Sequence, residues 1–516
     1  MTVVSNPILP GCHPDPTICR VGEDYYLVTS TFEYLPGLPV FRSRDLVDWE
    51  VVGHVIDRPG MLDLEGIRSS GGLYAPTLRH HDGRFWLLCT LVDQEDDARG
   101  GNFVVTAEDP SGPWSDPVWL DVDGIDPSVF FDDDGRIWVH GTRPARQPEW
   151  HDQTEVWLRE LDPHTMTLVT EEHVLWRGAV QGAVWAEGPH LYRVVGAYHL
   201  LAAEGGTDFH HAISVARADA VTGPYRGSKG NPVLTHRHLG RGVDITAVGH
   251  ADLVEAPDGS WWAVLLGMRP YGGYHCNLGR ETFLVPVVWE DGWPVFAPGI
   301  GRVEHEVEVP FAQPRAAAPV GGVIASNDPR WTSVRALPSE IAAADGEGWV
   351  LPLLPATLAD ATRSAFLGVR QQHRDVDVTA TIACALREGE EAGLVVRQSE
   401  DDHVRLSAIG VTGEEGTRVV AIHRSAGTER VIGEAVVAGA PHEDLVLMLR
   451  ARGQDYEMRA GRPGDDLAAV ATADGRTLDS IATGGFLGLW IGVHGTSNGA
   501  ATDSTMRVER VEYVPR

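Results

Sequence analysis

The sequence predicts an all-β protein in which a five-bladed β-propeller is followed by a β-sandwich. Three observations carry this prediction. A turn-linked pair of strand-like stretches returns five times in roughly the first 300 residues. A segment rich in Pro and Ala then interrupts the pattern. Beyond it lie many short alternating strand patterns, separated by turns that contain Gly and Asp.

Each repeat begins with a short apolar stretch, passes through a tight turn that usually contains Gly beside acidic residues, and ends in an aromatic-rich stretch. "DPTICRVGEDYYLVTS" and "DPSVFFDDDGRIWVHGT" are two examples. The units begin 51 to 63 residues apart, at Asp15, Ala75, Asp126, Gly188 and Ala251. A propeller blade has four strands and roughly 40–50 residues before insertions. Further strand-like stretches between the units favour five blades, with a sandwich as the alternative fold for this half.

Composition divides the chain into a propeller over residues 1–309, a linker over residues 310–322 and a sandwich over residues 323–516. A chain of 516 residues is too long for one ordinary core. The linker is assigned from its Pro and Ala content. Alternating patterns such as "VDVTATIACAL" and "FLGLWIGVHG" predict the short antiparallel strands of the sandwich.

The composition also limits the partners. A formal charge of −31 repels phosphate backbones, so we expect no nucleic-acid partner. No window approaches the ~18 apolar residues of a membrane span. The first residues show no signal-peptide pattern, so we expect no membrane association and a cytoplasmic protein. The five cysteines lack CxxC spacing, which predicts buried free thiols rather than a zinc site or a disulfide framework.

The repeats place three acidic residues at one position of the propeller. Asp15, Asp126 and Glu187 stand at the first residue of a unit or just before it. Tyr74 and His250 stand at the same place in the other two units. Equivalent positions on the innermost strands face the central axis, so we expect these side chains to meet at one mouth of the funnel. Each acid alone could be an ordinary turn or surface residue, but their shared register favours a site.

Three converging carboxylates cannot all ionise freely, so their pKa values separate. One acid then stays protonated near neutral pH while another stays a carboxylate. Glycoside hydrolysis needs that pair, because an acid protonates the leaving oxygen while a base activates water or a nucleophile attacks. The third carboxylate would adjust the pKa of the acid. Acids on different blades are expected to lie far apart, and wide separation favours inversion of configuration.

Other residues fit a sugar pocket as well as a structural role. Phe32 and Tyr74 could be core residues, or aromatic platforms on which a sugar stacks. Arg280 could pair with a surface acid, or lower the pKa of a pocket carboxylate and bind sugar hydroxyls. His250 could be a core histidine, or could hydrogen-bond a neighbouring acid or hold a cation through water.

The motifs "HPDPT", "GGLYAPTLRHHDGRFWLL", "GIDPS", "WAEGPH" and "GHADLVEAPDGSWWAVLLGMRP" resemble those of glycoside hydrolase family 43. The resemblance covers nearly the whole chain, and it is strongest to β-xylosidase and α-L-arabinofuranosidase members that carry an added sandwich. It implies a five-bladed propeller, a jelly-roll (concanavalin-like) β-sandwich, and hydrolysis by single displacement with inversion.

The resemblance also implies residue roles. Asp15 matches the general base, Glu187 the general acid, and Asp126 the carboxylate that adjusts the pKa and orientation of the acid. No cofactor is required for the chemistry, but a structural Ca²⁺ is expected on the axis beneath His250. The residues that match positions lining the sugar pocket are Phe32, Tyr74, Thr207, Arg280 and His250.

Two features of the family remain open at this level. Many xylosidases of this type carry Trp where this chain has Tyr74, which leaves the choice of pentose undecided. The family also places an aromatic residue of the second domain over the pocket, and we expect it in the loop His494–Asn498. The sandwich would then close the far side of the pocket and favour short oligomers cut from the end.

The sequence therefore predicts an exo-glycosidase that removes β-1,4-linked xylose from the non-reducing end of xylo-oligosaccharides. An α-L-arabinofuranosidase, or an enzyme with both activities, is the alternative within enzymes, and its substrates would be arabinosylated fragments. A sugar-binding propeller without catalysis is the alternative outside enzymes. The resemblance further implies a homo-oligomer.

Overall fold

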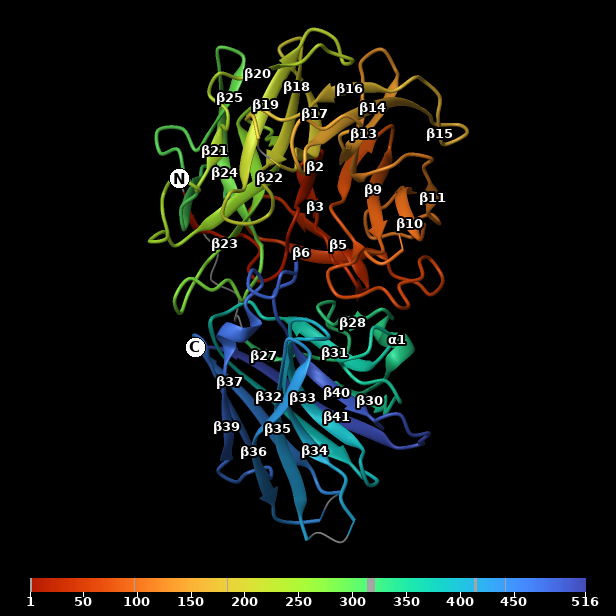
Figure 1. The fold of residues 1–516 in the computed structure, drawn as a ribbon, viewed down its shortest axis with the longest axis vertical. Coiled ribbons are helices and arrows are strands. Elements are labelled where there is room, and N and C mark those ends of the chain that lie inside the picture. Colours follow the sequence, from red (N-terminus) through yellow and green to blue (C-terminus); the bar gives the residue numbers. More distant parts are fainter. Residues whose placement is uncertain (1, 97, 183, 313–320, 413–414, 441) are drawn as a thin grey trace.

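The computed structural model describes residues 2–96, 98–182, 184–312, 321–412, 415–440 and 442–516. Figure 1 shows two bodies stacked along the long axis, with the N-terminal half of the chain in one and the C-terminal half in the other. Nearly all regular structure is β, and the described residues contain one short α-helix, α1 (Pro338–Ile341), and one 3₁₀ turn, Gly475–Leu478. No helix in this part of the chain is long and apolar enough to cross a membrane.

Five separate antiparallel sheets form the blades of the propeller. Blade one contains β2 (Thr17–Val21), β3 (Asp24–Val28), β5 (Gly37–Ser43) and β6 (Glu50–Ile56). Blade two contains β7 (Gly72–Leu73), β8 (Thr77–His81), β9 (Arg84–Val92), β10 (Gly100–Ala107) and β11 (Val118–Trp119). Blade three contains β12 (Ile125–Phe131), β13 (Ile137–Pro144), β14 (Thr154–Asp162), β15 (Thr167–Leu168) and β16 (His173–Trp176). Blade four contains β17 (Glu187–Val194), β18 (Ala197–Glu204), β19 (Ala212–Ala218), β20 (Arg226–Gly227) and β21 (Leu234–Thr235). Blade five contains β22 (Thr246–Glu255), β23 (Trp261–Met268), β24 (Glu281–Glu290) and β25 (Trp293–Phe296).

The predicted repeats coincide with the first hairpin of every blade. Strands β2, β8, β12, β17 and β22 are the first strands of those hairpins, and neighbours in this series contact one another, with β22 returning to β2. The first and last strands of the propeller segment also lie together, because β1 (Thr2–Ser5) pairs with β26 (Glu306–Val309). The five-bladed prediction is therefore confirmed.

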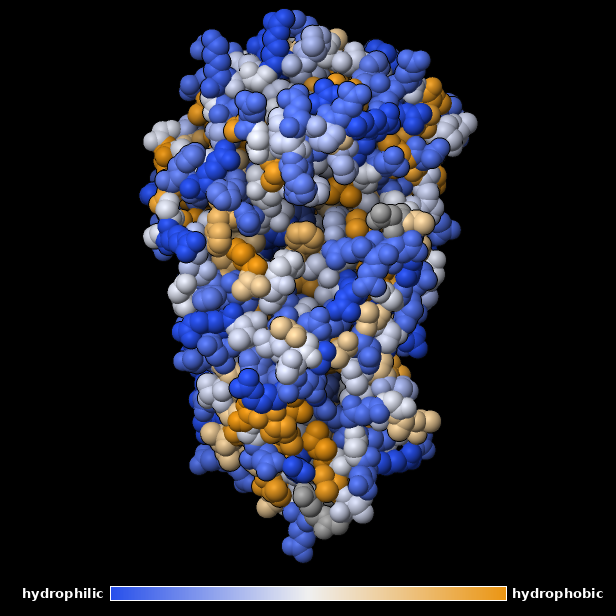
Figure 2. All heavy atoms as spheres, viewed as in Figure 1, coloured by the Kyte–Doolittle hydropathy of each residue, from blue (hydrophilic) through white to orange (hydrophobic). Residues whose placement is uncertain are grey.

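The sandwich consists of two facing antiparallel sheets. One contains β27 (Gly322–Val323), β29 (Ala343–Asp345), β30 (Gly348–Pro352), β32 (Asp375–Cys384), β37 (Leu445–Arg452), β38 (Asp455–Gly461), β39 (Ala468–Asp474) and β41 (Thr505–Pro515). The other contains β31 (Ala365–Arg370), β33 (Glu391–Arg397), β34 (His403–Ile409), β35 (Thr417–Ser425), β36 (Thr428–Val437) and β40 (Trp490–Thr496). An apolar area is visible on the sandwich in Figure 2, and the end strand β36 exposes Val431 and Val436.

The cores follow the alternation in the sequence. Along β32, Val378, Ala380 and Ile382 point inward and are almost completely buried, and they share one cluster with Leu394 and Leu406 of the opposite sheet. A buried Val or Leu side chain contributes roughly 1.5–3 kcal/mol to folding. All five cysteines are buried and free, as predicted.

The two domains are joined by more than a linker. Strand β4 (Tyr34–Leu35) of the propeller pairs with β28 (Ser333–Val334) of the sandwich. The ring of Tyr34 stacks on Trp490, with 3.9 Å between centroids. The buried Arg397 donates to the Tyr34 hydroxyl (2.7 Å) and to Glu33 (3.2 Å). These contacts fix the sandwich against the propeller; residues 313–320 of the predicted linker lie outside the described residues.

Candidate active site

The backbone turns sharply at the repeated position that carries the acids. Asp15 and Asp126 both have φ of 53°, in the left-handed region that Asp tolerates better than most residues. His250 has φ of 49° and Gly188 has φ of 55°. In three of the inner strands the pairing register shifts directly after this position, as in a β-bulge. A bulge redirects side chains, and here it accompanies the turn of the acids toward the axis.

Gly188 shows why one repeat has no side chain at this point. A Cβ on Gly188 would lie 2.7 to 2.9 Å from the imidazole of His250. Because real Cβ atoms do not approach so closely, the imidazole can lie over this position only if it is glycine. The preceding residue, Glu187, supplies the acid of this blade instead.

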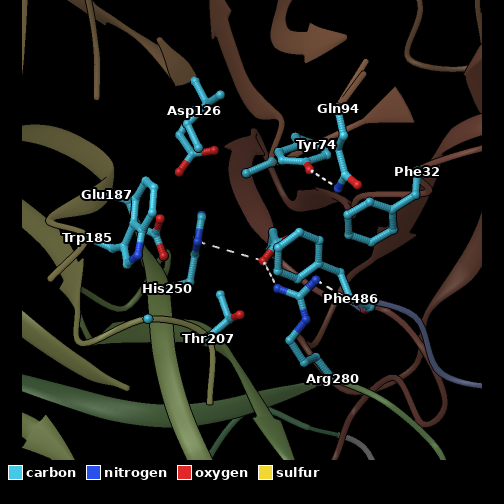
Figure 3. A pocket seen from close by; sticks show the side chains of 14 residues that line it. Phe32, Tyr74, Gln94, Asp126, Trp185, Glu187, Thr207, His250, Arg280 and Phe486 are labelled. Atoms are coloured by element: carbon cyan, nitrogen blue, oxygen red, sulfur yellow. Dashed lines mark hydrogen bonds and ion pairs between the residues drawn. The ribbon is translucent and has the colours of Figure 1, made fainter. Parts of the chain in front are cut away.

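A cavity of about 290 Å³ opens at this mouth of the propeller. Its size is close to the lower limit for ligand pockets, and it suits one sugar ring. All eight residues that the sequence singled out line it: Asp15, Phe32, Tyr74, Asp126, Glu187, Thr207, His250 and Arg280. Figure 3 shows Asp126 and Glu187 on one side of the cavity, and Arg280 and Phe32 on the other.

Asp15 is held as a carboxylate. It is 5% exposed, and its Oδ2 accepts a hydrogen bond from the Ser30 hydroxyl (2.6 Å). Its Oδ1 accepts from the Arg280 guanidinium (3.0 Å) and lies 3.7 Å from His250 Nδ1. Burial raises the pKa of Asp15, but Arg280, His250 and Ser30 outweigh burial, so the pKa lies below its ordinary value. Asp15 is therefore ionised across the neutral range.

The pKa values of Glu187 and Asp126 shift in the opposite direction to that of Asp15. Burial, with the nearby charges of Asp126 and Asp15, raises the pKa of Glu187 well above its ordinary value. Burial also raises the pKa of Asp126 to about 6, although His250 lowers it. Asp126 accepts a hydrogen bond from the amide of Gly188 (3.0 Å), the residue that follows Glu187. The pocket thus combines an ionised carboxylate with a protonated carboxylic acid.

Six further residues line the pocket without being among the predicted site residues, and three of them have large polar or aromatic side chains: Gln94, Trp185 and Phe486. The Gln94 amide donates to the hydroxyl of Tyr74 (3.0 Å). Trp185 stands two residues before Glu187, within the "WAEGPH" motif, so its place beside the acid could have been read from the sequence. Gln94 lies in an acidic loop that carries no recognisable signal.

The prediction for the aromatic residue of the second domain is wrong in position. The loop His494–Asn498 does not line the pocket. His494 lies in β40, is 2% exposed and contacts the Ser407 hydroxyl inside the sandwich (3.0 Å). The aromatic residue that reaches the pocket is Phe486, which precedes β40 in "GGFLGLW".

Phe486 completes an aromatic wall. Its ring stacks on Phe32, with 5.9 Å between centroids, and meets Tyr74 edge-on at 5.8 Å. The Arg280 guanidinium lies 5.3 Å from the Phe486 ring and donates to the Phe486 carbonyl (3.3 Å). The Ser70 hydroxyl accepts from the Phe486 amide (2.8 Å). The second domain thus contributes one wall of the pocket and contacts the arginine that binds Asp15.

Replacing Phe486 by alanine is expected to raise KM roughly tenfold while kcat changes less, because a ring pair contributes about 0.5–1.5 kcal/mol beyond its buried area. Steady-state kinetics on xylobiose measure this effect. Phe486→Leu, which keeps apolar volume without a ring, is expected to fall between wild type and Phe486→Ala. An unchanged KM in Phe486→Ala would show that this wall does not contact the substrate.

The residues on the axis do not fit the Ca²⁺ that the resemblance implies. Calcium takes 6–8 oxygen ligands. Among the described residues no group of three or more His, Cys, Asp or Glu side chains could hold a metal ion. His250 would offer one nitrogen, and Asp252, two residues further along β22, already accepts hydrogen bonds at both oxygens. We therefore derive no step through a metal ion.

A propeller whose axial pocket holds one ionised and one protonated carboxylate has the machinery of a glycoside hydrolase. The comparisons agree with this class. Residues 4–294 match the family model described as Glycosyl hydrolases family 43. Residues 326–514 match the model described as Beta xylosidase C-terminal Concanavalin A-like domain. The chain belongs to glycosyl hydrolase family 43.

Similar proteins match along the full length. A "Xylosidase/arabinosidase" of Butyrivibrio fibrisolvens is 37% identical over 517 residues, which cover 98% of each chain. A "Non-reducing end alpha-L-arabinofuranosidase" of Bacteroides ovatus is 36% identical, over 96% of this chain and 92% of that one. The crystal structure of a "xylan beta-1,4-xylosidase" from Bacillus halodurans matches with a TM-score of 0.91 and 31% identity, over 99% of this chain and 100% of that one.

Proposed function

We propose that this glycoside hydrolase removes β-1,4-linked xylose from the non-reducing end of xylo-oligosaccharides, with inversion of configuration. The observation that carries the proposal is the convergence of Asp15 and Glu187 on one cavity, where Asp15 is bound by Arg280 (3.0 Å) and Glu187 is buried near Asp126. These surroundings lower the pKa of Asp15 and raise that of Glu187. An inverting reaction needs a carboxylate that activates water and a carboxylic acid that protonates the leaving oxygen at the same pH.

In the proposed mechanism, Glu187 donates its proton to the glycosidic oxygen as the bond to the anomeric carbon breaks. Asp15 accepts a proton from a water that attacks the opposite face of the sugar. Asp126 keeps Glu187 protonated through its charge, and its bond to the Gly188 amide holds the backbone beside the acid. Since β2 and β17 belong to different blades, the two groups approach the sugar from different sides, as inversion requires.

The closed wall supports cleavage from the chain end. Phe486 and Phe32 stack across one side of a cavity that accommodates about one sugar ring. A long polymer would have to pass through this wall, whereas a terminal residue can enter from the open side. The name of the Bacillus halodurans relative supports xylose as that terminal residue.

The second candidate activity is cleavage of α-L-arabinofuranosides, by the same residues. It is favoured by the names of the Butyrivibrio and Bacteroides relatives. The hydrogen bond between Gln94 and Tyr74 presents an amide and a hydroxyl at the pocket rim, where they could bind the exocyclic hydroxymethyl group of arabinofuranose. An enzyme with both activities is consistent with these observations.

Paired assays on 4-nitrophenyl β-D-xyloside and 4-nitrophenyl α-L-arabinofuranoside test the proposal. We expect a higher kcat/KM on the xyloside, release of xylose from xylobiose, and α-xylose as the first product by NMR. Cleavage of the arabinoside alone would replace the first candidate by the second. Binding of xylobiose without hydrolysis of any substrate would identify a sugar-binding propeller instead.

A further inference from the structure

A buried polar cluster lies on the propeller axis, one step along the inner strands from the catalytic residues. Thr17 follows Asp15 by two residues, and Asp252 follows His250 by two. Asp15 and His250 line the catalytic pocket, whereas the Thr17 hydroxyl donates to Asp252 (2.8 Å) outside it, so the two pairs occupy successive levels of the propeller. Every blade contributes to this cluster, which we call the axial hub: Thr17, Arg79, Ser128, His190, Tyr192 and Asp252.

Asp252 is the centre of the axial hub, and it is completely buried. Its Oδ2 accepts from the Thr17 hydroxyl (2.8 Å) and from Arg79 (2.7 Å). Its Oδ1 accepts from Arg79 (3.0 Å) and from the Tyr192 hydroxyl (2.6 Å). A backbone amide donates to each oxygen as well, both at 2.9 Å. The carboxylate therefore has no free position for a metal ion.

Arg79 is the cation of the axial hub. Besides its two bonds to Asp252, its guanidinium lies 3.2 Å from His190 Nδ1, which in turn lies 3.1 Å from the Ser128 hydroxyl. Burial lowers the pKa of Arg79, but Asp252 outweighs burial and raises it, so the guanidinium is charged. Ring nitrogens of His140 and His190 are among the buried atoms of this region that lack a hydrogen-bond partner. Because calcium prefers oxygen ligands, these nitrogens do not make a calcium site.

We infer that Arg79 is the axial cation of this propeller, and that its guanidinium serves in place of a metal ion beneath the catalytic layer. The bidentate pair with Asp252 joins blade two to blade five, and the remaining contacts reach blades one, three and four. Because Asp15 and His250 are two residues from hub members, the axial hub fixes their positions. Arg79 is thus a positioning residue, and the inference rests on the proposed hydrolase function.

The opposite end of the axis gives access to Arg79. A second cavity, of about 360 Å³, is lined by Arg79, Tyr192, Phe131 and Trp261 among others. Phe131 ends β12 and Trp261 begins β23, whereas Arg79 and Tyr192 lie within β8 and β17, and none of the catalytic acids lines this second cavity. The Arg79 side chain is 16% exposed. A small guanidinium ion can therefore reach the place of the side chain when that side chain is shortened.

The first test measures dependence on metal. Wild-type protein dialysed against EDTA is expected to keep its kcat and Tm, and calorimetric titration with CaCl₂ is expected to show no binding. Loss of kcat on chelation with recovery in CaCl₂, or stoichiometric Ca²⁺ binding by calorimetry, would overturn the inference. The calorimetric result is independent of the activity, so a wild-type protein that cleaves neither pentoside would count against the proposed function alone.

The second test removes the cation. Arg79→Ala is expected to lower kcat roughly 10²-fold, since small displacements of catalytic groups have effects of that size. Guanidinium chloride at concentrations far below those that unfold the protein is expected to restore part of the activity, while urea, its neutral counterpart, does not. Equal effects of the two additives, or wild-type kcat without either, would overturn the inference.

Arg84→Ala, an exposed position at the start of β9, is the matched control. Arg79→Lys provides a second variant should the alanine variant not fold, because it keeps the charge. It is expected to retain more activity than Arg79→Gln at a similar Tm, without any response to CaCl₂. Equal losses in Arg79→Lys and Arg79→Gln would show that the charge is not what the axis requires.

Discussion

Replacement of Glu187 by glutamine is expected to lower kcat on xylobiose by about 10²–10⁴-fold, the usual contribution of a general acid. Glutamine keeps the size of the side chain but has no acidic proton to donate. Burial and the charges of Asp126 and Asp15 keep Glu187 protonated in the wild type, so the variant loses a group that is active at neutral pH. Glu23→Gln, an exposed turn position of the first blade, is the matched control.

The dependence on the leaving group separates loss of the acid from a general loss of structure. A nitrophenolate leaves without a proton, so Glu187→Gln is expected to retain far more activity on 4-nitrophenyl xyloside than on xylobiose. The acid is needed in its protonated form, and its pKa is raised. Wild-type activity should therefore decline as pH rises through that pKa, and this decline should disappear in the variant. Equal losses on both substrates would exclude Glu187 as the acid.

The repeated register accounts for how much of the pocket could be predicted from the sequence. Asp15, Asp126 and Glu187 recur at one position of a five-fold unit, so their convergence follows from radial symmetry without knowledge of any contact. His250 shares this register, whereas Arg280 is predicted from its chemistry alone, and both contact Asp15 in the structure. The pattern did not reveal that the left-handed backbone, rather than the flanking prolines alone, sets the direction of the Asp15 and Asp126 side chains.

The sequence repeat does not predict the contacts between the two domains. Phe486 is separated from Phe32 by more than 450 residues, and no repeat relates the two. Its position depends on the pairing of β4 with β28, two strands of two residues each that no periodicity indicates. The buried contact between Arg397 and Glu33 likewise joins segments whose sequences show no link. The packing of the two domains determines which of these residues come into contact, and a single sequence contains little information about that packing.

The sequence also does not predict the charge pairing inside the axial hub. Asp252 follows "GHA" and Arg79 follows "APTL", so both stand within motifs that the sequence made conspicuous. Alternation places Asp252 on the axis two residues after His250, but it does not show which partner neutralises it. That Arg79 reaches Asp252 from another blade depends on the ring closing between β8 and β22 through β2. Charge pairing across the axis is therefore a property of the assembled propeller.

Replacement of Asp15 by asparagine is expected to lower kcat by about 10²–10⁴-fold as well, through loss of the general base. Asparagine tolerates the left-handed backbone that Asp15 adopts, with φ of 53°, so the fold should be retained. Asp82→Asn, at an exposed turn residue with φ of 49°, controls for the same substitution in the same backbone conformation.

Glu187→Gln and Asp15→Asn should differ in how their activity depends on the leaving group. Water must be activated whatever the leaving group is, so Asp15→Asn is expected to be slow on xylobiose and on 4-nitrophenyl xyloside alike. The pKa of Asp15 is lowered and its ionised form is the active one, so wild-type activity should fall only when pH drops through that low pKa. Recovery of Asp15→Asn on the nitrophenyl substrate would assign Asp15 to leaving-group protonation, because only a step that the leaving group controls can be bypassed by changing the leaving group.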